Sequence, residues 1–157
     1  MSKLLHGAVA IALAMLCVAG CGSDRAAQWV EQVESAHAAA DAALEDGKTD
    51  RAREVLEQAF RRTVPPSVQE TDARVVRQDL AYRLAELELG AGRAEAAEEH
   101  ASRGLGLGKA EDVFTANLYI ARGRAREALG RDIEAAEDYH EALKINDALL
   151  RRTLDEP

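Results

Sequence analysis

Residues 116–146 read ANLYIARGRAREALGRDIEAAEDYHEALKIN and contain two helical patterns separated at Gly130. In the second pattern, Ala135, Tyr139 and Ala142 recur at steps of four and three residues, which places them on one face of a helix. Glycine commonly ends an amphipathic helix because, lacking a Cβ, it adopts a left-handed backbone conformation without a clash. The stretch therefore predicts a hairpin of two closely packed helices.

The same stretch resembles one tetratricopeptide repeat (TPR), a helical-hairpin family with the pattern W-x2-L-G-x2-Y…A-x3-F…P. The positions that correspond to the pattern are Tyr119 at Trp, Gly123 at Gly, Ala135 at Ala and Tyr139 at Phe. The positions that depart from its Leu, Tyr and Pro are Arg122, Arg126 and Asp147. The resemblance implies that small residues let the two helices approach closely and that Tyr139 fills the remaining gap.

The pattern that follows the glycine occurs three times in the chain. The turn glycines are Gly47, Gly92 and Gly130, which lie 45 and 38 residues apart, against 34 in the TPR family. An Ala-x3-apolar-x2-small pattern begins five residues after each glycine; its members are Ala52, Leu56 and Ala59, then Ala97, Ala101 and Gly104, then Ala135, Tyr139 and Ala142. The additional length falls in the loops 64–70 and 106–111, where insertions cost little.

From these repeats we expect an all-α protein, a short right-handed solenoid of about three TPR-like hairpins with six helices over residues 28–153. The expected helices are 26–45, 51–62, 71–89, one after Gly92, one before Gly130, and one from Asp132 towards Leu150. The expected N-caps are Thr49 or Asp50 for the second helix and Asp132 for the last. The apolar stripe of the first helix consists of Trp29, Val33, Ala36, Ala40, Ala43 and Leu44. A generic helical bundle is the alternative fold.

The composition agrees with closely packed helices. Of the 157 residues, 47% are hydrophobic but only 4% are aromatic, and three are proline. Because β-sheets favour β-branched and aromatic residues, this composition leaves little for them. The net charge of −8 argues against a nucleic-acid partner, which normally needs a basic surface.

The N-terminal segment reads MSKLLHGAVAIALAMLCVAGC and has the order of parts of a secretory signal peptide. Lys3 precedes an apolar stretch of about 14 residues, which is shorter than the ~20 residues of a membrane-spanning helix. The segment ends in VAGC, which resembles the bacterial lipobox, whose Cys is acylated and becomes the new N-terminus after cleavage. The resemblance implies a signal peptide over 1–20, a lipidated Cys21 and a short tether over 21–27.

The alternative is a conventional signal peptide cleaved near Ala19, which would leave Cys21 as a free thiol in an oxidising compartment. Cys17 lies in the segment to be removed, so the mature chain keeps one Cys and has no internal disulfide. Acyl chains on Cys21 would anchor the protein stably to the membrane. Because Gly22 rather than Asp follows the Cys, we expect the outer membrane of a bacterial envelope, with the domain facing the periplasm.

The sequence gives no consistent signal for a catalytic, metal or cofactor site. Residues 104–109, GLGLGK, depart from the phosphate-binding Walker loop, so we expect a flexible loop there. His37, His100 and His140 occupy non-equivalent positions in different repeats, which argues against a shared metal site. We therefore expect no enzymatic activity, no cofactor and no bound metal.

Stacked TPR hairpins curve so that their first helices line a concave face, and the resemblance implies a partner-binding groove there. The expected groove residues are Glu34, His37 and Asp41, then Asp79, Tyr82 and Glu86, then Asn117, Ile120 and Arg124. Four carboxylates against one Arg favour a basic or apolar protein or peptide, with Tyr82 and Ile120 as apolar anchors. The alternative is that these residues are only solvated and that the protein binds through its edges.

Together these features predict a membrane-anchored envelope lipoprotein that acts as a protein–protein interaction scaffold or assembly factor. It resembles the small bacterial TPR lipoproteins that help to assemble pili, secretion machines or outer-membrane complexes. One alternative is a self-associating structural spacer that uses the exposed end of the third hairpin. Another is an accessory subunit of an enzyme.

Overall fold

The structure is a computed structural model that describes the backbone of residues 3–155 and the side chains of residues 24–155. Within that range the chain forms six helices and no strand, so the expected all-helical class and number of helices are confirmed. The helices are α1 (Lys3–Glu45), α2 (Thr49–Phe60), α3 (Glu70–Gly90), α4 (Ala94–Gly106), α5 (Val113–Ala128) and α6 (Asp132–Asp155). None of the described helices is both long and apolar enough to cross a membrane. The side chains of Cys21 and of the expected signal peptide lie outside the described residues.

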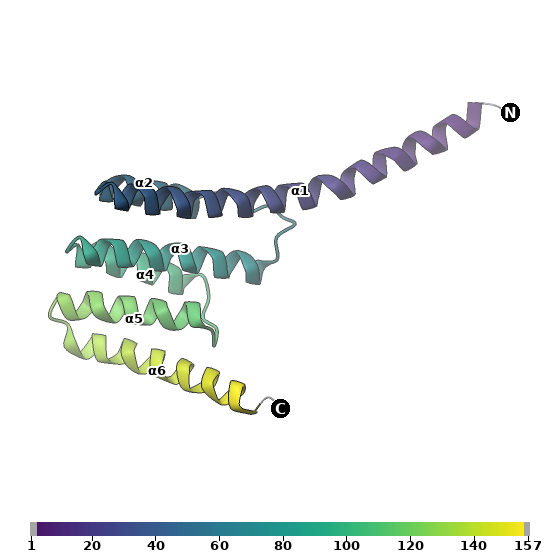
Figure 1. Cartoon of the computed structure of the whole chain (residues 1–157). Coiled ribbons are helices and arrows are strands. Elements are labelled where there is room, and N and C mark those ends of the chain that lie inside the picture. Colours follow the sequence, from purple (N-terminus) through teal and green to yellow (C-terminus); the bar gives the residue numbers. More distant parts are fainter. Residues whose placement is uncertain (1–2, 156–157) are drawn as a thin grey trace.

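The helices pack as successive antiparallel pairs (Figure 1). Helix α1 lies against α2, α3 against α4, and α5 against α6, while α2 with α3, α4 with α5 and α3 with α5 join one pair to the next. In Figure 1, α1, α3 and α5 follow one another down the molecule, and α6 lies at one end of the row. Among the described residues, each helix therefore packs closely only against helices one or two places away in the chain.

Three turns between helices have the same backbone geometry. The turn glycines Gly47, Gly92 and Gly130 have positive φ angles of 72°, 74° and 72°. The N–H of the residue after each glycine donates to the carbonyl oxygen five residues earlier, at 2.7 to 2.8 Å. This arrangement is the Schellman motif, which satisfies carbonyl groups left free at a helix end. The turn geometry expected at the three glycines is therefore confirmed.

Small residues at the repeated positions bring the helices close together. Ala52, Ala97 and Ala135 are each at most 2% exposed. A Cβ placed on Gly123 would lie 2.6 Å from the ring of Tyr139, so the contact between α5 and α6 requires glycine at this position. The expected packing of Tyr139 over Gly123 is confirmed.

The buried apolar side chains form two clusters that share α3. The first joins α1, α2 and α3 and includes Trp29, Leu56 and Leu84. The second joins α3 to α4, α5 and α6. The expected stripe of α1 belongs to the first cluster, except for Leu44, which is 42% exposed because it lies beyond the packed face in the last turn of α1.

The expected helix starts are wrong at two positions. The carbonyl of Lys48 accepts the first helical hydrogen bond, from Ala52 at 3.1 Å, so Lys48 is the N-cap and Thr49 is the first residue of α2; the Lys48 side chain has no acceptor with which to cap the helix. For the same reason Asp132 lies in the first turn of α6 rather than before it. Residues 21–27, expected as a lipidated Cys and short tether, form part of α1.

Side chains of α3 hold the segment between α4 and α5. The buried amide of Gln78 donates to the carbonyl oxygens of Gly104 at 3.3 Å and Gly108 at 2.8 Å. Arg74, one turn earlier on α3, donates in turn to the amide oxygen of Gln78. Of residues 104–109, expected as a flexible loop, 104–106 are the end of α4, whereas 107–109 do form a loop, which Gln78 holds through the carbonyl oxygen of Gly108.

Asp112 is the side-chain cap of α5. Its carboxylate accepts from the backbone N–H of Thr115 and from Arg74, both at 2.8 Å. Burial alone would raise the pKa of Asp112, but the hydrogen bonds from Thr115 and Arg74 outweigh it and lower the pKa below its ordinary value. The carboxylate therefore stays ionised at neutral pH and links α3 to the start of α5.

We predict that Asp112→Ala lowers the free energy of unfolding by about 1–2 kcal/mol at pH 7, because α5 loses its side-chain cap and Arg74 loses the carboxylate with which it pairs. The matched control Thr49→Ala, at a helix start without a side-chain cap, should change it by less than about 0.5 kcal/mol. Because the pKa of folded Asp112 is lowered, the stabilisation is present above the unfolded pKa and is lost as pH falls through the folded pKa. Urea unfolding at several pH values measures both effects; equal losses in the two variants would contradict the assignment.

A second prediction concerns the close helix contacts. Ala97→Leu should lower the free energy of unfolding by about 1–3 kcal/mol, because the fully buried site has no room for a larger side chain. Ala39→Leu, at an exposed position of α1, is the control and should be nearly neutral. Thermal unfolding monitored by circular dichroism compares the two, and the same stability in both would argue against the register of the repeat.

Candidate partner-binding surface

The first helices of the three pairs, α1, α3 and α5, share one face. On this face His37 of α1 lies 3.4 Å from Asp79 of α3. Farther along, the Arg124 guanidinium of α5 lies 2.5 Å from the carboxylate of Glu86 on α3. The structure therefore brings together residues that the sequence assigned to one surface from three separate repeats.

A mainly apolar hollow of about 270 Å³ opens on this face. Its lining consists of Val30, Val33, Glu34, His37, Val75, Val76, Asp79 and Phe114. Val30 is 43% exposed although it is apolar, so part of the wall faces solvent. Four valines and one phenylalanine could accept an apolar side chain of a partner, since recognition sites commonly combine apolar walls with few polar groups.

Two carboxylates at the hollow have no Lys or Arg partner among the described residues. Glu34 is exposed and forms no ion pair within the described part of the chain. In the same part of the chain, the ionisable side chain in contact with the Asp79 carboxylate is that of His37. Burial and then the nearby guanidinium of Arg83 lower the pKa of His37, so its ring is neutral at pH 7. The Nδ1 atom of His37 accepts from Arg83 at 2.7 Å, which leaves the proton on Nε2, towards Asp79. The hollow therefore has an acidic rim.

Farther along the face, acidic and basic side chains form ion pairs. The sequence predicts four carboxylates against one Arg on this face, and the structure corrects that count. Arg83 was not among the expected groove residues, yet it forms an ion pair with Asp41 across the gap between α3 and α1. Glu86 is likewise neutralised by Arg124. A helical spacing of four residues from Asp79 to Arg83 was the signal that could have found this Arg.

The expected apolar anchors are also less available than the sequence indicated. Tyr82 and Ile120 are half-buried and pack against the second core cluster. Burial and the neighbouring Glu86 carboxylate raise the pKa of Tyr82, so it remains a neutral phenol. Asn117 is half-buried on the same face of α5. The apolar part of the candidate surface thus lies around Val30 and Phe114 rather than around these residues.

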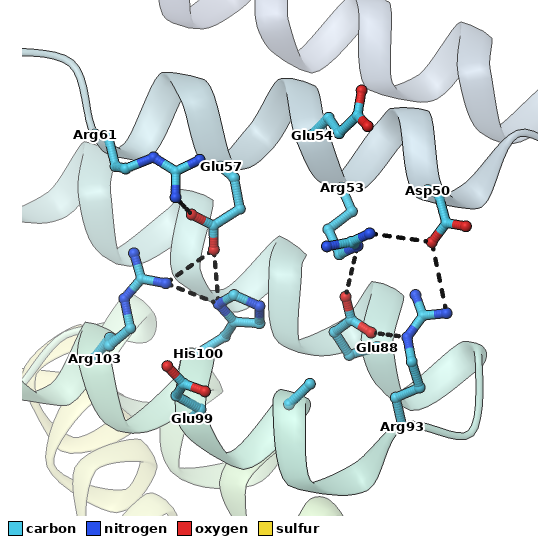
Figure 2. Close-up of a pocket in the computed structure, with 11 residues that line it drawn as sticks. Asp50, Arg53, Glu54, Glu57, Arg61, Glu88, Arg93, Glu99, His100 and Arg103 are labelled. Carbon is cyan, nitrogen blue, oxygen red and sulfur yellow. Dashed lines mark hydrogen bonds and ion pairs between the residues drawn. The ribbon is translucent and has the colours of Figure 1, made fainter.

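A second, charged cleft of about 620 Å³ lies on the other helices, between α2 and α4 (Figure 2). At one end Glu57 of α2 lies 2.8 Å from Arg61, 2.9 Å from Arg103 and 3.3 Å from the ring of His100. This cluster could not be expected from the sequence, because its members come from different helical hairpins at non-equivalent positions.

At the other end of the cleft, Glu88 at the end of α3 is only 1% exposed. It forms ion pairs with Arg93 and, at 3.6 Å, with Arg53 of α2. A buried charge is costly unless it is paired, and here each buried carboxylate has an Arg beside it. The pairs join α2 to the next hairpin, so the cleft is best explained as an ionic contact between hairpins.

In the part of the chain that the structure describes, no Ser, Thr, Cys or Lys side chain lines the cleft. Burial lowers the pKa of His100, with Glu57 acting in the opposite direction, so the ring is neutral at pH 7. Arg103 also stacks over the ring of Phe60, with its guanidinium carbon 4.3 Å from the ring centre. Among the described residues, no group of three or more His, Cys, Asp or Glu side chains is placed to hold a metal ion.

No family model and no curated protein matches this chain. The apolar hollow with its acidic rim is the candidate site on the strength of its own geometry and charge.

Proposed function

We propose that this protein is a lipid-anchored scaffold or assembly factor of the bacterial cell envelope that binds a protein partner on the face of α1, α3 and α5. The observation that carries the proposal is the apolar hollow beside the carboxylates of Glu34 and Asp79, neither of which is neutralised by an Arg or Lys among the described residues. An accessible apolar wall beside uncompensated charge is better suited to recognition than to stability.

The same proposal includes a short right-handed solenoid of three TPR-like hairpins. Its support is the threefold recurrence of one turn geometry, followed each time by a buried Ala five residues after the glycine. The contact of Gly123 with Tyr139 is the packing that the TPR resemblance implies for the third hairpin. In such an array the first helices line one face, which is the face that carries the hollow.

Attachment to the membrane rests on the sequence VAGC at residues 18–21. A Cys at this junction would be acylated on its sulfur and, after cleavage, on its new amino group. Two or more acyl chains give stable anchoring, whereas one alone is marginal. The outer membrane, with the domain facing the periplasm, is the proposed location.

The partner would present an apolar side chain next to Lys or Arg. The valine walls would accept the apolar group, and Glu34 and Asp79 would face the basic one. Such charge pairs at a rim mainly raise the association rate and select the partner, and salt screens them over ~8–10 Å. Binding should therefore weaken with salt, while the apolar contribution persists.

We predict that Cys21→Ser releases the protein from the membrane fraction, because the acylated thiol is the proposed anchor. The matched control Cys17→Ser changes the Cys that is removed with the signal peptide, so the protein should stay in the membrane fraction. Fractionation of cells that express each variant, followed by circular dichroism of the released protein, measures the effect. A Cys21→Ser variant that remains in the membrane fraction would refute the lipid anchor.

The partner-binding surface is tested by placing a photo-crosslinking amino acid at Val30 or, as a control, at Glu54 on the charged cleft in the native cell envelope. We expect crosslinking from position 30 to give a defined protein adduct, and we expect that adduct to be missing when the crosslinker is at position 54. Adding Glu34→Lys should lower the yield of that adduct about tenfold, which corresponds to about 1.4 kcal/mol of binding free energy. The absence of an adduct at position 30, or a yield unchanged by Glu34→Lys, would contradict the proposed surface.

A further inference from the structure

Helix α6 exposes four large apolar side chains on its outer surface. Ile133 is 80% exposed, Leu143 67%, Leu150 58% and Leu154 74%. These are four of the seven large apolar residues of the described chain that are exposed. Exposed apolar residues that gather on one element mark an interaction surface, whereas single ones need no explanation.

The four residues lie on one face of the helix. At 100° per residue they fall within an arc of about 100°, together with Ala136, His140 and Asp147, and with Asp132 and Arg151 at its two edges. We call the four apolar residues, with Ala136, His140 and Asp147, the α6 stripe. Their spacing of three and four residues continues from one end of α6 to the other, as in helices that pair along a seam.

The α6 stripe points away from the rest of the protein. Among the described helices, α6 packs closely only against α5, through the buried residues Ala135, Ala142 and Ile145 on its opposite face. Figure 1 shows α6 at the end of the row of helices, with no further helix beyond it. The stripe is therefore a second surface, separate from the hollow on α1, α3 and α5.

The charges beside the stripe are distributed unequally along α6. In the N-terminal half, Glu137 is exposed and forms no ion pair within the described part of the chain, whereas Glu134 and Asp138 lie on the side of α5 and pair with Arg126. In the C-terminal half, Lys144 pairs with Glu141, Arg152 with Glu111, and Arg151 with Asp147 of the same helix. The Arg151 side chain is 74% exposed, and exposed ion pairs of this kind contribute little, so Arg151 is available to a carboxylate of a partner.

We propose that α6 pairs with α6 of a second copy of this chain, antiparallel, through the α6 stripe. Antiparallel pairing sets Glu137 of each copy beside Arg151 of the other, whereas parallel pairing would set Glu137 beside Glu137 and Arg151 beside Arg151. The contact is isologous, so the favourable pair of charges occurs twice. The leucines of both copies cover one another.

The pairing can be measured by analytical ultracentrifugation of the full chain in density-matched detergent over a range of protein concentrations. The wild-type protein should form a dimer. Leu143→Glu and Leu150→Glu should each weaken dimerisation at least about tenfold, because they place charge in an apolar contact. Leu44→Glu is the matched control, since Leu44 is exposed and apolar but lies on α1, and it should dimerise as the wild type does.

A charge exchange tests the antiparallel orientation. Glu137→Lys and Arg151→Glu should each weaken the dimer, and the double variant should restore it. The two positions are 14 residues apart, about 21 Å along one helix, so they cannot compensate within one chain. Only contact between two chains in antiparallel orientation explains a rescue.

The proposal is overturned by a wild-type chain that stays monomeric throughout the concentration range. It is also overturned if the α6 variants dimerise as the wild type does, or if Leu44→Glu weakens the dimer equally. A dimer that both stripe variants disrupt but the double charge variant does not restore would refute the antiparallel arrangement. Circular dichroism confirms that each variant is folded.

Discussion

The structure depends on close approach between helices at positions that have little or no side chain. A Cβ on Gly104 of α4 would lie 2.7 Å from Leu118 of α5 and 2.9 Å from the Cβ of Ala81 on α3. Helix α4 is therefore held between two neighbours by a residue that cannot be larger. Protein interiors are close-packed, so a widening at this point would separate two hairpins and open their apolar cores.

Buried ion pairs decide which helices meet. Between the first and second hairpins, Glu57 contacts Arg103 and Glu88 contacts Arg53. In the third hairpin, Asp138 of α6 pairs with Arg122 at 2.6 Å and Arg126 at 3.0 Å. Such pairs add little net stability because both charges lose water, but the loss of one partner is costly. They oppose any shift of one helix along another, whereas apolar contacts between alanines would tolerate it.

Periodic features of the chain could be predicted from the sequence, and features without a period could not. The turn glycines and the small residues after them recur at fixed spacings, so the helices followed from local pattern, whereas the shared face of α1, α3 and α5 was expected only from the resemblance to the TPR family. The candidate hollow includes three of the nine expected groove residues, Glu34, His37 and Asp79. Phe114 was missed because it stands in the first turn of its helix, and the charged cleft was missed because only the fold brings its residues together.

Packing between near neighbours in the chain also bears on how the protein reaches its native state. No described helix packs closely against one more than two places away, so each contact closes a short loop at small entropic cost. Chains with such local contacts fold quickly compared with chains that must join distant segments. The α1–α2 hairpin can form its turn and much of its own apolar core before α5 takes part in folding. The protein can therefore fold in the order in which it is synthesised, without waiting for its C-terminus.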